Sequence, residues 1–288
     1  MHLLQTDAAT LDDIVEPVDL GQTPGDIVVL SFVDSDLTGL ASAYAAERDV
    51  LPSVRLAHLR ELRHPMSIDL WIDTVARHAK IIVVRLLGGL DWWHYGVEQL
   101  AAAAHEHGIA LAVLPGEDRD DARLFEAGTL RTDDLKTLLA YFREGGPDNL
   151  RGLLRCLACH AGRNLDVPKP ARVPRMAGYV PGKGAVPLHV LCDEIATGNP
   201  LVPILFYRAA LLSTDTAPID ALCAALARRG LTPAPLFVPS LKDKDAAAFV
   251  RETLQVLSPA AVVTTTAFAA GDGETSPFDG TEAPILQA

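Results

Sequence analysis

A stretch of aromatic, glycine and charged residues, RLLGGLDWWHYG, occupies residues 85–96 of this 288-residue chain. It follows the β-branched run Ile81–Val84, which lacks polar alternation, as in a strand buried on both faces of a parallel sheet. Paired glycines permit a sharp turn or a close approach of the backbone to a ligand. Because ligands of open α/β sheets lie beyond the carboxyl ends of the strands, we predict a binding site here. Its candidate residues are Arg85, Gly88, Gly89, Asp91, Trp92, Trp93, His94 and Tyr95.

Two roles remain open for these side chains. Asp91 stands where the N-cap of a helix over residues 92–107 would fall. Trp92 and Trp93 either contact a ligand or only pack against the sheet, and His94 is either a ligand contact or an exposed residue of the first helical turn.

A second candidate is Arg208, which follows an expected strand over residues 201–207. Its guanidinium group has the fork geometry that holds a substrate carboxylate. The helix that comes next is expected to be capped by Asp215 or Thr216.

Three cysteine and histidine residues, Cys156, Cys159 and His160, form the C-x-x-C-H pattern of c-type haem attachment. The pattern lies within an amphipathic helical sequence, and the N-terminus shows no export signal. We therefore expect these residues to be incidental to the helix, with a thiol or zinc role as the open alternative.

Other nucleotide and catalytic motifs are missing from the sequence. There is no G-x-x-x-x-G-K-[ST], no G-x-G-x-x-G and no G-x-S-x-G, so bound nucleotide and serine hydrolysis have no motif to support them. Asp34 and Asp36 follow the first expected strand, as the acidic pair of a response-regulator receiver does. No lysine stands where a receiver needs one, so helix capping is the better interpretation of both.

Composition excludes several classes of partner. A formal net charge of −12 disfavours nucleic acid, because that binding requires a surplus of Lys and Arg. No apolar run approaches the roughly 18 residues of a membrane span, so no membrane partner is expected. Four cysteines do not suggest a disulfide framework, and the expected location is the cytoplasm.

Strand and helix patterns alternate along the chain, which predicts an α/β fold with two doubly wound, flavodoxin- or Rossmann-like units. We place the first unit, with a helical extension, at residues 1–162, and a Pro/Gly-rich linker at 163–187. The second unit, at 188–288, is expected to be incomplete at its C-terminus. The expected strands cover residues 26–32, 54–59, 81–87, 109–114, 201–207, 232–238, 260–267 and 283–286.

Several segments of the chain resemble the N-terminal part of the CobN family, the large subunits of aerobic cobaltochelatase, which are related to the large subunit of magnesium chelatase. These segments are LGQTPGDIVVLSF, RLLGGLDWWHYGVEQL, YFREGGPDNL, GNPLVPILFYRAALLSTDTAPIDALCAAL and TTTAFA. The resemblance extends over nearly the whole sequence.

The resemblance implies a subunit that binds cobalt and the tetrapyrrole hydrogenobyrinic acid a,c-diamide in cobalamin biosynthesis. It also implies that separate AAA-type partner subunits hydrolyse ATP, which agrees with the missing P-loop. Chelation would require the remainder of the same subunit, and no catalytic residue of the family can be placed on this sequence. A flat macrocycle with carboxylates matches the aromatic rings and guanidinium group of residues 85–95. A non-catalytic scaffold module and the equivalent region of a magnesium chelatase are the alternatives.

Overall fold

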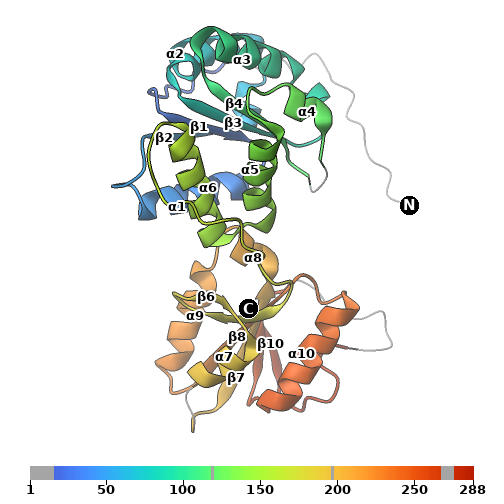
Figure 1. The fold of residues 1–288 in the computed structure, drawn as a ribbon. Coiled ribbons are helices and arrows are strands. Elements are labelled where there is room, and N and C mark those ends of the chain that lie inside the picture. The colour runs from blue at the N-terminus through green and yellow to red at the C-terminus, as the bar shows by residue number, and fades with distance from the viewer. Residues whose placement is uncertain (1–15, 118–119, 196–197, 267–275) are drawn as a thin grey trace, which may run out of the picture. The chain divides into compact units, whose positions relative to one another are not determined.

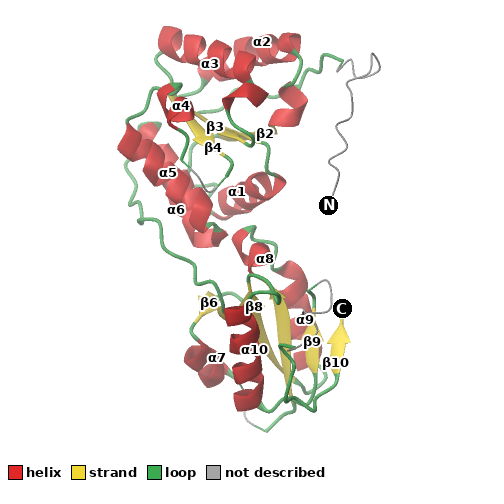
Figure 2. Cartoon of the chain, turned by 90° about the vertical axis from the view of Figure 1, so that its right-hand side faces the viewer, coloured by secondary structure: helices red, strands yellow, loops and turns green. Residues whose placement is uncertain are grey.

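The computed structural model describes residues 16–117, 120–195, 198–266 and 276–288 (Figures 1 and 2). The chain divides into two compact units. The first consists of the residues up to Arg143 together with Arg151–Pro168, and the second of Glu144–Leu150 together with the residues from Lys169 onward. Within the described parts of the chain, no helix is both long and apolar enough to cross a membrane.

The first unit contains a four-stranded, all-parallel sheet in the order β2-β1-β3-β4. Every residue of β1 and β3 is buried, as expected for strands covered on both faces. Figures 1 and 2 show α2 and α3 on one face of this sheet and α1 and α5 on the other. The strands are β1 Ile27–Ser31, β2 Val54–His58, β3 Ile81–Leu86 and β4 Ala110–Pro115.

Helices of the first unit alternate with its strands and then follow the last of them. They are α1 Asp34–Ala46, α2 Pro65–Thr74, α3 His94–His107, α4 Ala122–Glu126, α5 Thr132–Glu144 and α6 Gly146–His160, with 3-10 turns at Leu59–Leu62 (η1), Ala76–His78 (η2) and Leu90–Trp92 (η3). The last two α-helices cross the boundary between the units. Every second residue of these strands faces one core. This core contains Val28, Ile82 and Val113 of the strands, together with Trp71 of α2 and Leu100 of α3.

The second unit contains a sheet of six strands in the order β10-β9-β7-β8-β5-β6. Strands β7 to β10 run parallel, whereas β5 is antiparallel to both β8 and β6. The strands are β5 Ala177–Val180, β6 Gly184–Val186, β7 Leu201–Tyr207, β8 Thr232–Val238, β9 Val262–Thr264 and β10 Ile285–Gln287. The helices are α7 Leu188–Glu194, α8 Arg208–Leu212, α9 Ala217–Ala227 and α10 Lys244–Leu257.

This mixed α/β architecture with parallel sheets confirms the predicted fold class. The prediction of a linker over residues 163–187 is wrong for its last part, because β5 and β6 form a hairpin that pairs with β8. The residues between these two strands, Pro181-Gly182-Lys183, make the tight turn, in which Lys183 N donates to Val180 O at 2.9 Å. Proline and glycine therefore mark a turn inside a sheet here. The expected strand 260–267 is shorter in the structure, and its last residue lies outside the described residues.

Candidate functional site

A two-glycine turn connects β3 to η3 at the carboxyl edge of the first sheet. Gly88 and Gly89 have φ of +86° and +81°, a conformation that residues with a Cβ rarely adopt. A Cβ on Gly88 would lie 2.4 Å from Trp92 Cδ1, so the indole lies directly on the glycine backbone. Glu117, which follows β4, accepts a hydrogen bond from Gly88 N at 2.6 Å. The turn is thus held in place by the neighbouring strand's loop.

The two adjacent tryptophans occupy opposite environments. Trp92 is 68% exposed, whereas Trp93 is 5% exposed and belongs to the core. Trp93 Nε1 donates to Leu62 O at 2.7 Å. Its ring fits because Gly96 has no side chain, since a Cβ there would lie 2.2 Å from Trp93 Cε2. Of the two roles left open for it, Trp93 therefore has the packing role and is no longer a ligand-contact candidate, whereas Trp92 remains one.

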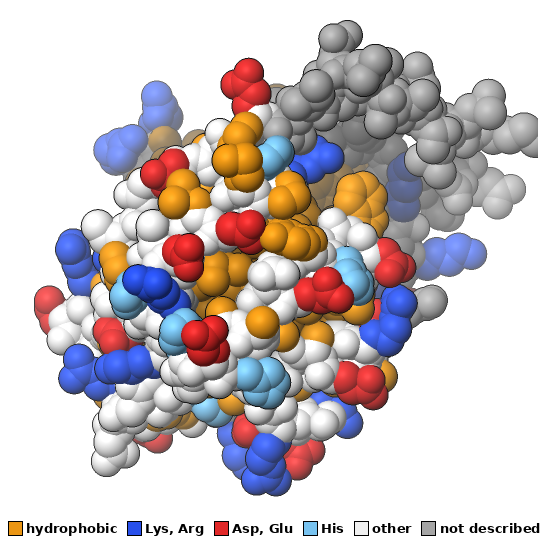
Figure 3. Space-filling model, turned by 90° about the horizontal axis from the view of Figure 1, so that it is seen from above, with side chains coloured by type: hydrophobic (Ala, Val, Ile, Leu, Met, Phe, Trp, Pro, Cys, Tyr) orange, Lys and Arg blue, Asp and Glu red, His pale blue; other side chains and the backbone are white. Residues whose placement is uncertain are grey.

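The residues that flank Trp92 are also exposed. Tyr95 donates from its hydroxyl to Asp69 Oδ1 of α2 at 2.8 Å, and this hydrogen bond raises the pKa of Tyr95. His94 Nδ1 lies 3.5 Å from Glu98 Oε2. Figure 3 views the molecule from above, over α2 and α3, and shows hydrophobic side chains interspersed with acidic and histidine side chains.

Asp91 does not cap a helix. It lies in η3, and α3 begins three residues later at His94 with Trp93 as an N-cap that makes no side-chain cap bond. The Asp91 carboxylate is 82% exposed and lies 3.9 Å from Arg123 Nη1. The capping pattern predicted a helix that starts directly after Asp91. Because a 3-10 turn comes between the glycines and the helix, the helix starts later than predicted.

Arg85 faces the interior of the first unit. It is 7% exposed, and its Nη1 lies 2.5 Å from Asp36 Oδ1. Nε and Nη2 donate to the carbonyls of Pro115 and Gly116, and the guanidinium carbon lies 4.8 Å from the centre of the Phe142 ring. The predicted surface role of Arg85 is wrong, because these groups hold its guanidinium beneath the sheet edge.

Asp36 belongs to the same buried hydrogen-bond network as Arg85. Its second oxygen, Oδ2, accepts a hydrogen bond from Ser31 Oγ at 2.7 Å, and Asp36 is only 8% exposed. Asp34 is exposed and pairs instead with His58 and Arg60, each at 3.2 Å. Neither aspartate caps α1, whose N-cap is Val33 without a side-chain bond. The receiver-like aspartate pair is thus divided between the core and the surface.

In the second unit, Arg208 donates to two backbone carbonyls. Nε bonds Pro174 O and Nη2 bonds Val173 O, both at 2.9 Å. The guanidinium therefore anchors the segment before β5 to the end of β7. The N-cap of α9 is Thr216, one of the two residues predicted to cap this helix, but its side chain makes no cap hydrogen bond.

The C-x-x-C-H residues lie on helix α6. Burial raises the pKa of the Cys156 thiol to about 11, and Cys159 Sγ contacts Leu165 O at 3.6 Å. Among the residues that the structure describes, no group of three or more His, Cys, Asp or Glu side chains could hold a metal ion. These three residues thus lie on a packed helix, and an incidental role for them stays a prediction.

Sequence analysis missed Glu117, Arg123 and Asp69 around the glycine turn. Glu117 follows β4 directly, so the carboxyl-edge rule that identified residues 85–96 also applies to it. Asp69 and Arg123 approach from α2 and α4 and have no comparable signal in the sequence. These three residues contact Gly88, Asp91 and Tyr95, the neighbours of the exposed Trp92, and an exposed indole suits noncovalent contact with a flat ligand.

Comparisons with known proteins extend these observations. Residues 139–288 match the family described as CobN/Magnesium Chelatase. Aerobic cobaltochelatase subunit CobN of Sinorhizobium sp is 39% identical over 301 residues, and that of Pseudomonas aeruginosa is 38% identical over 294 residues. Each alignment covers 100% of this chain, which spans 23% of the length of each relative.

A solved structure shares the fold. The catalytic subunit of cobaltochelatase from Mycobacterium tuberculosis matches with a TM-score of 0.70 and 24% identity, over 91% of this chain and 21% of that one. The family match covers more than half of the present sequence. This chain therefore belongs to the CobN/magnesium chelatase family.

Proposed function

We propose that this chain is the N-terminal part of the large subunit of an ATP-dependent cobaltochelatase that acts in the cytoplasm. The whole subunit would insert cobalt into hydrogenobyrinic acid a,c-diamide during cobalamin biosynthesis. The observation that carries the proposal is the alignment of the entire chain with two CobN subunits at 39% and 38% identity. Cobalt is a substrate of this reaction, and AAA-type partner subunits hydrolyse the ATP.

The proposal includes a division of labour within the large subunit. These 288 residues contribute to binding and assembly, and the remainder of the subunit completes the metal-inserting site. The lack of a three-ligand metal cluster among the described residues supports this division. The finer fold assignment, two doubly wound flavodoxin- or Rossmann-like units, is part of the same proposal. The order β2-β1-β3-β4, with helices on both faces, supports it for the first unit.

Within this function, we propose that Trp92 and Tyr95 form part of a surface that faces the tetrapyrrole. The Trp92 indole lies against the Gly88 backbone and is still 68% exposed, so a flat ring can stack on its free side. Stacking on such a face stabilises a flat ligand without covalent chemistry.

The function is tested in a complete subunit. Full-length Pseudomonas aeruginosa CobN is compared with a form that lacks the region aligned with this chain and with a chimera in which this chain replaces that region. Cobalt insertion is measured with the partner subunits and ATP. We expect the deletion to abolish insertion and the chimera to restore it. Insertion by the 288 residues alone, or full activity of the deletion form, would contradict the proposal.

The same assay separates the alternatives. A chimera that inserts magnesium into a porphyrin more readily than cobalt into the diamide would favour the magnesium chelatase function. A deletion form that still binds the tetrapyrrole but has lost insertion because it no longer binds its partner subunits would identify the region as a scaffold module.

The surface proposal is tested by tryptophan fluorescence in the active chimera. Trp71 and Trp93 are 3% and 5% exposed, so Trp92 is the exposed indole of this chain. We expect the tetrapyrrole to quench it and the quenching to be lost in Trp92→Phe. Affinity should fall about tenfold in Trp92→Ala, since base-like stacking on an aromatic contributes roughly 1–3 kcal/mol. Val50→Ala, which changes an exposed hydrophobic residue elsewhere in the unit, is the matched control. Equal affinities in all three variants would place the site elsewhere.

A further inference from the structure

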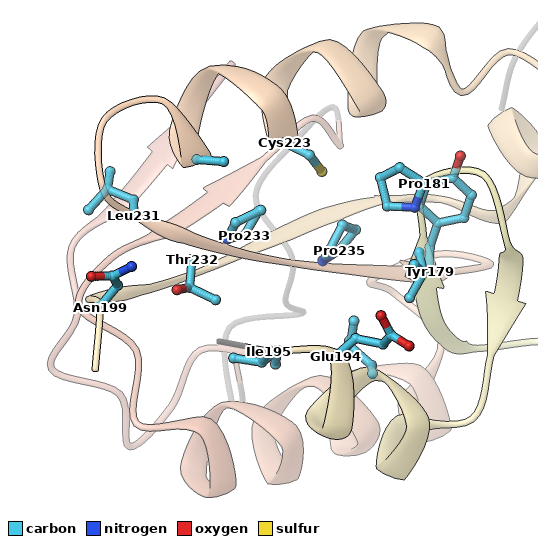
Figure 4. A pocket seen from close by; sticks show the side chains of 13 residues that line it. Tyr179, Pro181, Glu194, Ile195, Asn199, Cys223, Leu231, Thr232, Pro233 and Pro235 are labelled. Carbon is cyan, nitrogen blue, oxygen red and sulfur yellow. The ribbon is translucent and has the colours of Figure 1, made fainter. Parts of the chain in front are cut away.

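The second unit contains a cavity of about 300 Å³ at the amino-terminal half of β8. Figure 4 shows it between α9, which contributes Cys223, and the end of α7, which contributes Glu194. The edge of β8, with Pro233 and Pro235, runs between these two walls, and Asn199 and Leu231 lie at one end. None of the residues discussed as the candidate site of the first unit contributes to it.

Prolines explain why the cavity exists. The antiparallel pairing of β5 with β8 ends at Gly178 and Leu236. If this pairing continued in the same register, Tyr179 would lie opposite Pro235 and Pro181 opposite Pro233. Proline has no N–H, so neither strand can continue the exchange of hydrogen bonds, and the two strands separate.

One backbone acceptor is directed into this gap. Thr232 N donates to Pro200 O at 2.9 Å, on the β7 side of β8. Because both polar groups of a strand residue point the same way and successive residues alternate, the carbonyl of Pro233 faces the opposite, open edge. Pro181, its counterpart in register, has no N–H to donate to that carbonyl.

The side chains around the gap add acceptors and apolar walls. The Glu194 carboxylate is paired with Lys183 at 2.5 Å, so its charge is already compensated. Leu191 and Cys223 are buried, at 2% and 5% exposed, and form the two walls. Next to Pro233 O and Glu194, such a cavity favours a ligand with an apolar body and N–H donors, and it disfavours a carboxylate there, because a carboxylate brings only acceptors to these two acceptors.

We infer that this cavity binds a small, uncharged carboxamide, whose N–H groups donate to Pro233 O and Glu194 while its hydrocarbon part packs between α7 and α9. An ammonium ligand is less suited because Lys183 already neutralises Glu194. The inference does not depend on the chelatase function proposed above.

The test uses the full chain with methyl-labelled Ile195 and Leu231, both of which line the cavity. Benzamide, benzoate and benzylammonium are titrated as probes of one shape and three charges. We expect benzamide to shift both methyl resonances saturably and to bind about fivefold or more tightly than the other two, as expected for one lost or mismatched hydrogen bond.

Two variants locate the site. Ala227→Phe fills the cavity and should abolish the shifts, whereas Ala221→Phe on the same helix points away from it and should not. Pro233→Ala adds an N–H donor at the edge and should bring the affinity for benzoate close to that for benzamide. The inference is overturned if no probe gives saturable shifts, if benzoate binds most tightly, or if Ala227→Phe leaves binding unchanged. Binding of an extended peptide in preference to benzamide would also overturn it and identify a strand-docking edge.

Discussion

Each unit has an arginine at the carboxyl end of a central strand, within β3 in the first and directly after β7 in the second, and the two arginines have different partners. Arg85 of the first unit is buried and paired with Asp36, whereas Arg208 of the second is partly exposed and bonds the carbonyls of Val173 and Pro174. Both side chains fit the sequence signature of a carboxylate-binding residue. Their comparison shows that an arginine at a strand end is as readily used to hold a connecting segment as to hold a ligand.

The open spaces of the two units also have different origins. In the first, glycines at positive φ let the chain turn tightly beneath Trp92 at the carboxyl end of β3. In the second, prolines end a ladder at the amino end of β8. Glycine creates an accessible surface because it adopts the positive φ that a tight turn requires. Proline creates a cavity because it lacks the backbone N–H that would continue the pairing of two strands.

The largest expected effect is that of Arg85→Met. Removing the guanidinium leaves Asp36 buried without its cation, which should destabilise the first unit by about 3–5 kcal/mol. All three tryptophans, Trp71, Trp92 and Trp93, lie in this unit, so urea titration followed by tryptophan fluorescence reports it selectively. The double variant Arg85→Met/Asp36→Leu should recover most of the loss. A single variant as stable as the wild type would show that the ion pair is dispensable.

Gly96→Ala should have the next largest effect. Its Cβ would overlap the buried Trp93 ring, and overpacking of this kind costs about 1–3 kcal/mol. Gly88→Ala is the matched comparison, because its Cβ would meet the exposed ring of Trp92, which can move aside, and only the backbone penalty of about 1–2 kcal/mol remains. Acrylamide quenching of the tryptophan fluorescence should increase, relative to the wild type, in Gly88→Ala and not in Gly96→Ala. The reverse pattern would mean that the two indoles have been assigned to the wrong environments.

Arg208→Met should destabilise the second unit by about 1–2 kcal/mol, since two charge-assisted hydrogen bonds at a partly exposed position are lost. The readout is the thiol of Cys223, which is 5% exposed and whose pKa burial raises to about 11. Its reaction with a disulfide reagent should accelerate in the variant, while the tryptophan unfolding curve stays unchanged. Cys192→Ser removes the exposed thiol from the background. An unaltered rate for Cys223 would contradict the anchoring role.

The smallest effect concerns the pH dependence of the first unit. Arg155 donates to both oxygens of Glu47 at 2.8 Å and lowers the pKa of that carboxyl below its ordinary value of 4.5. The pair therefore adds stability above about pH 4.5, which is lost as the pH falls through the lowered pKa. Because Arg155 is 31% exposed, the contribution is about 1 kcal/mol. In urea titrations at pH 3 to 7, Glu47→Gln should remove this part of the fall in the free energy of unfolding with decreasing pH. An unchanged pH dependence would show that the Glu47–Arg155 pair does not contribute to it.

Local sequence determined many, but not all, of the regular elements of this protein. The β-branched run of β3 and the glycines after it predicted a buried strand and a turn. Strands buried on both faces are rich in β-branched residues, and a backbone at positive φ favours glycine. The alternation of strand and helix patterns likewise predicted the α/β class. The proline-rich segment was misjudged, because proline and glycine mark a hairpin turn as readily as a linker.

Tertiary structure alone decided which predicted site residues reach the surface. Arg85 became an interior residue because it pairs with Asp36, 49 positions away, and no local pattern records such a pairing. Trp92 and Trp93 differ in exposure because a 3-10 turn sets where α3 begins, and one residue of a helix turn rotates the next side chain by about 100°. Periodicity identifies what a segment forms, whereas the direction of each polar side chain depends on partners that only the folded chain brings near.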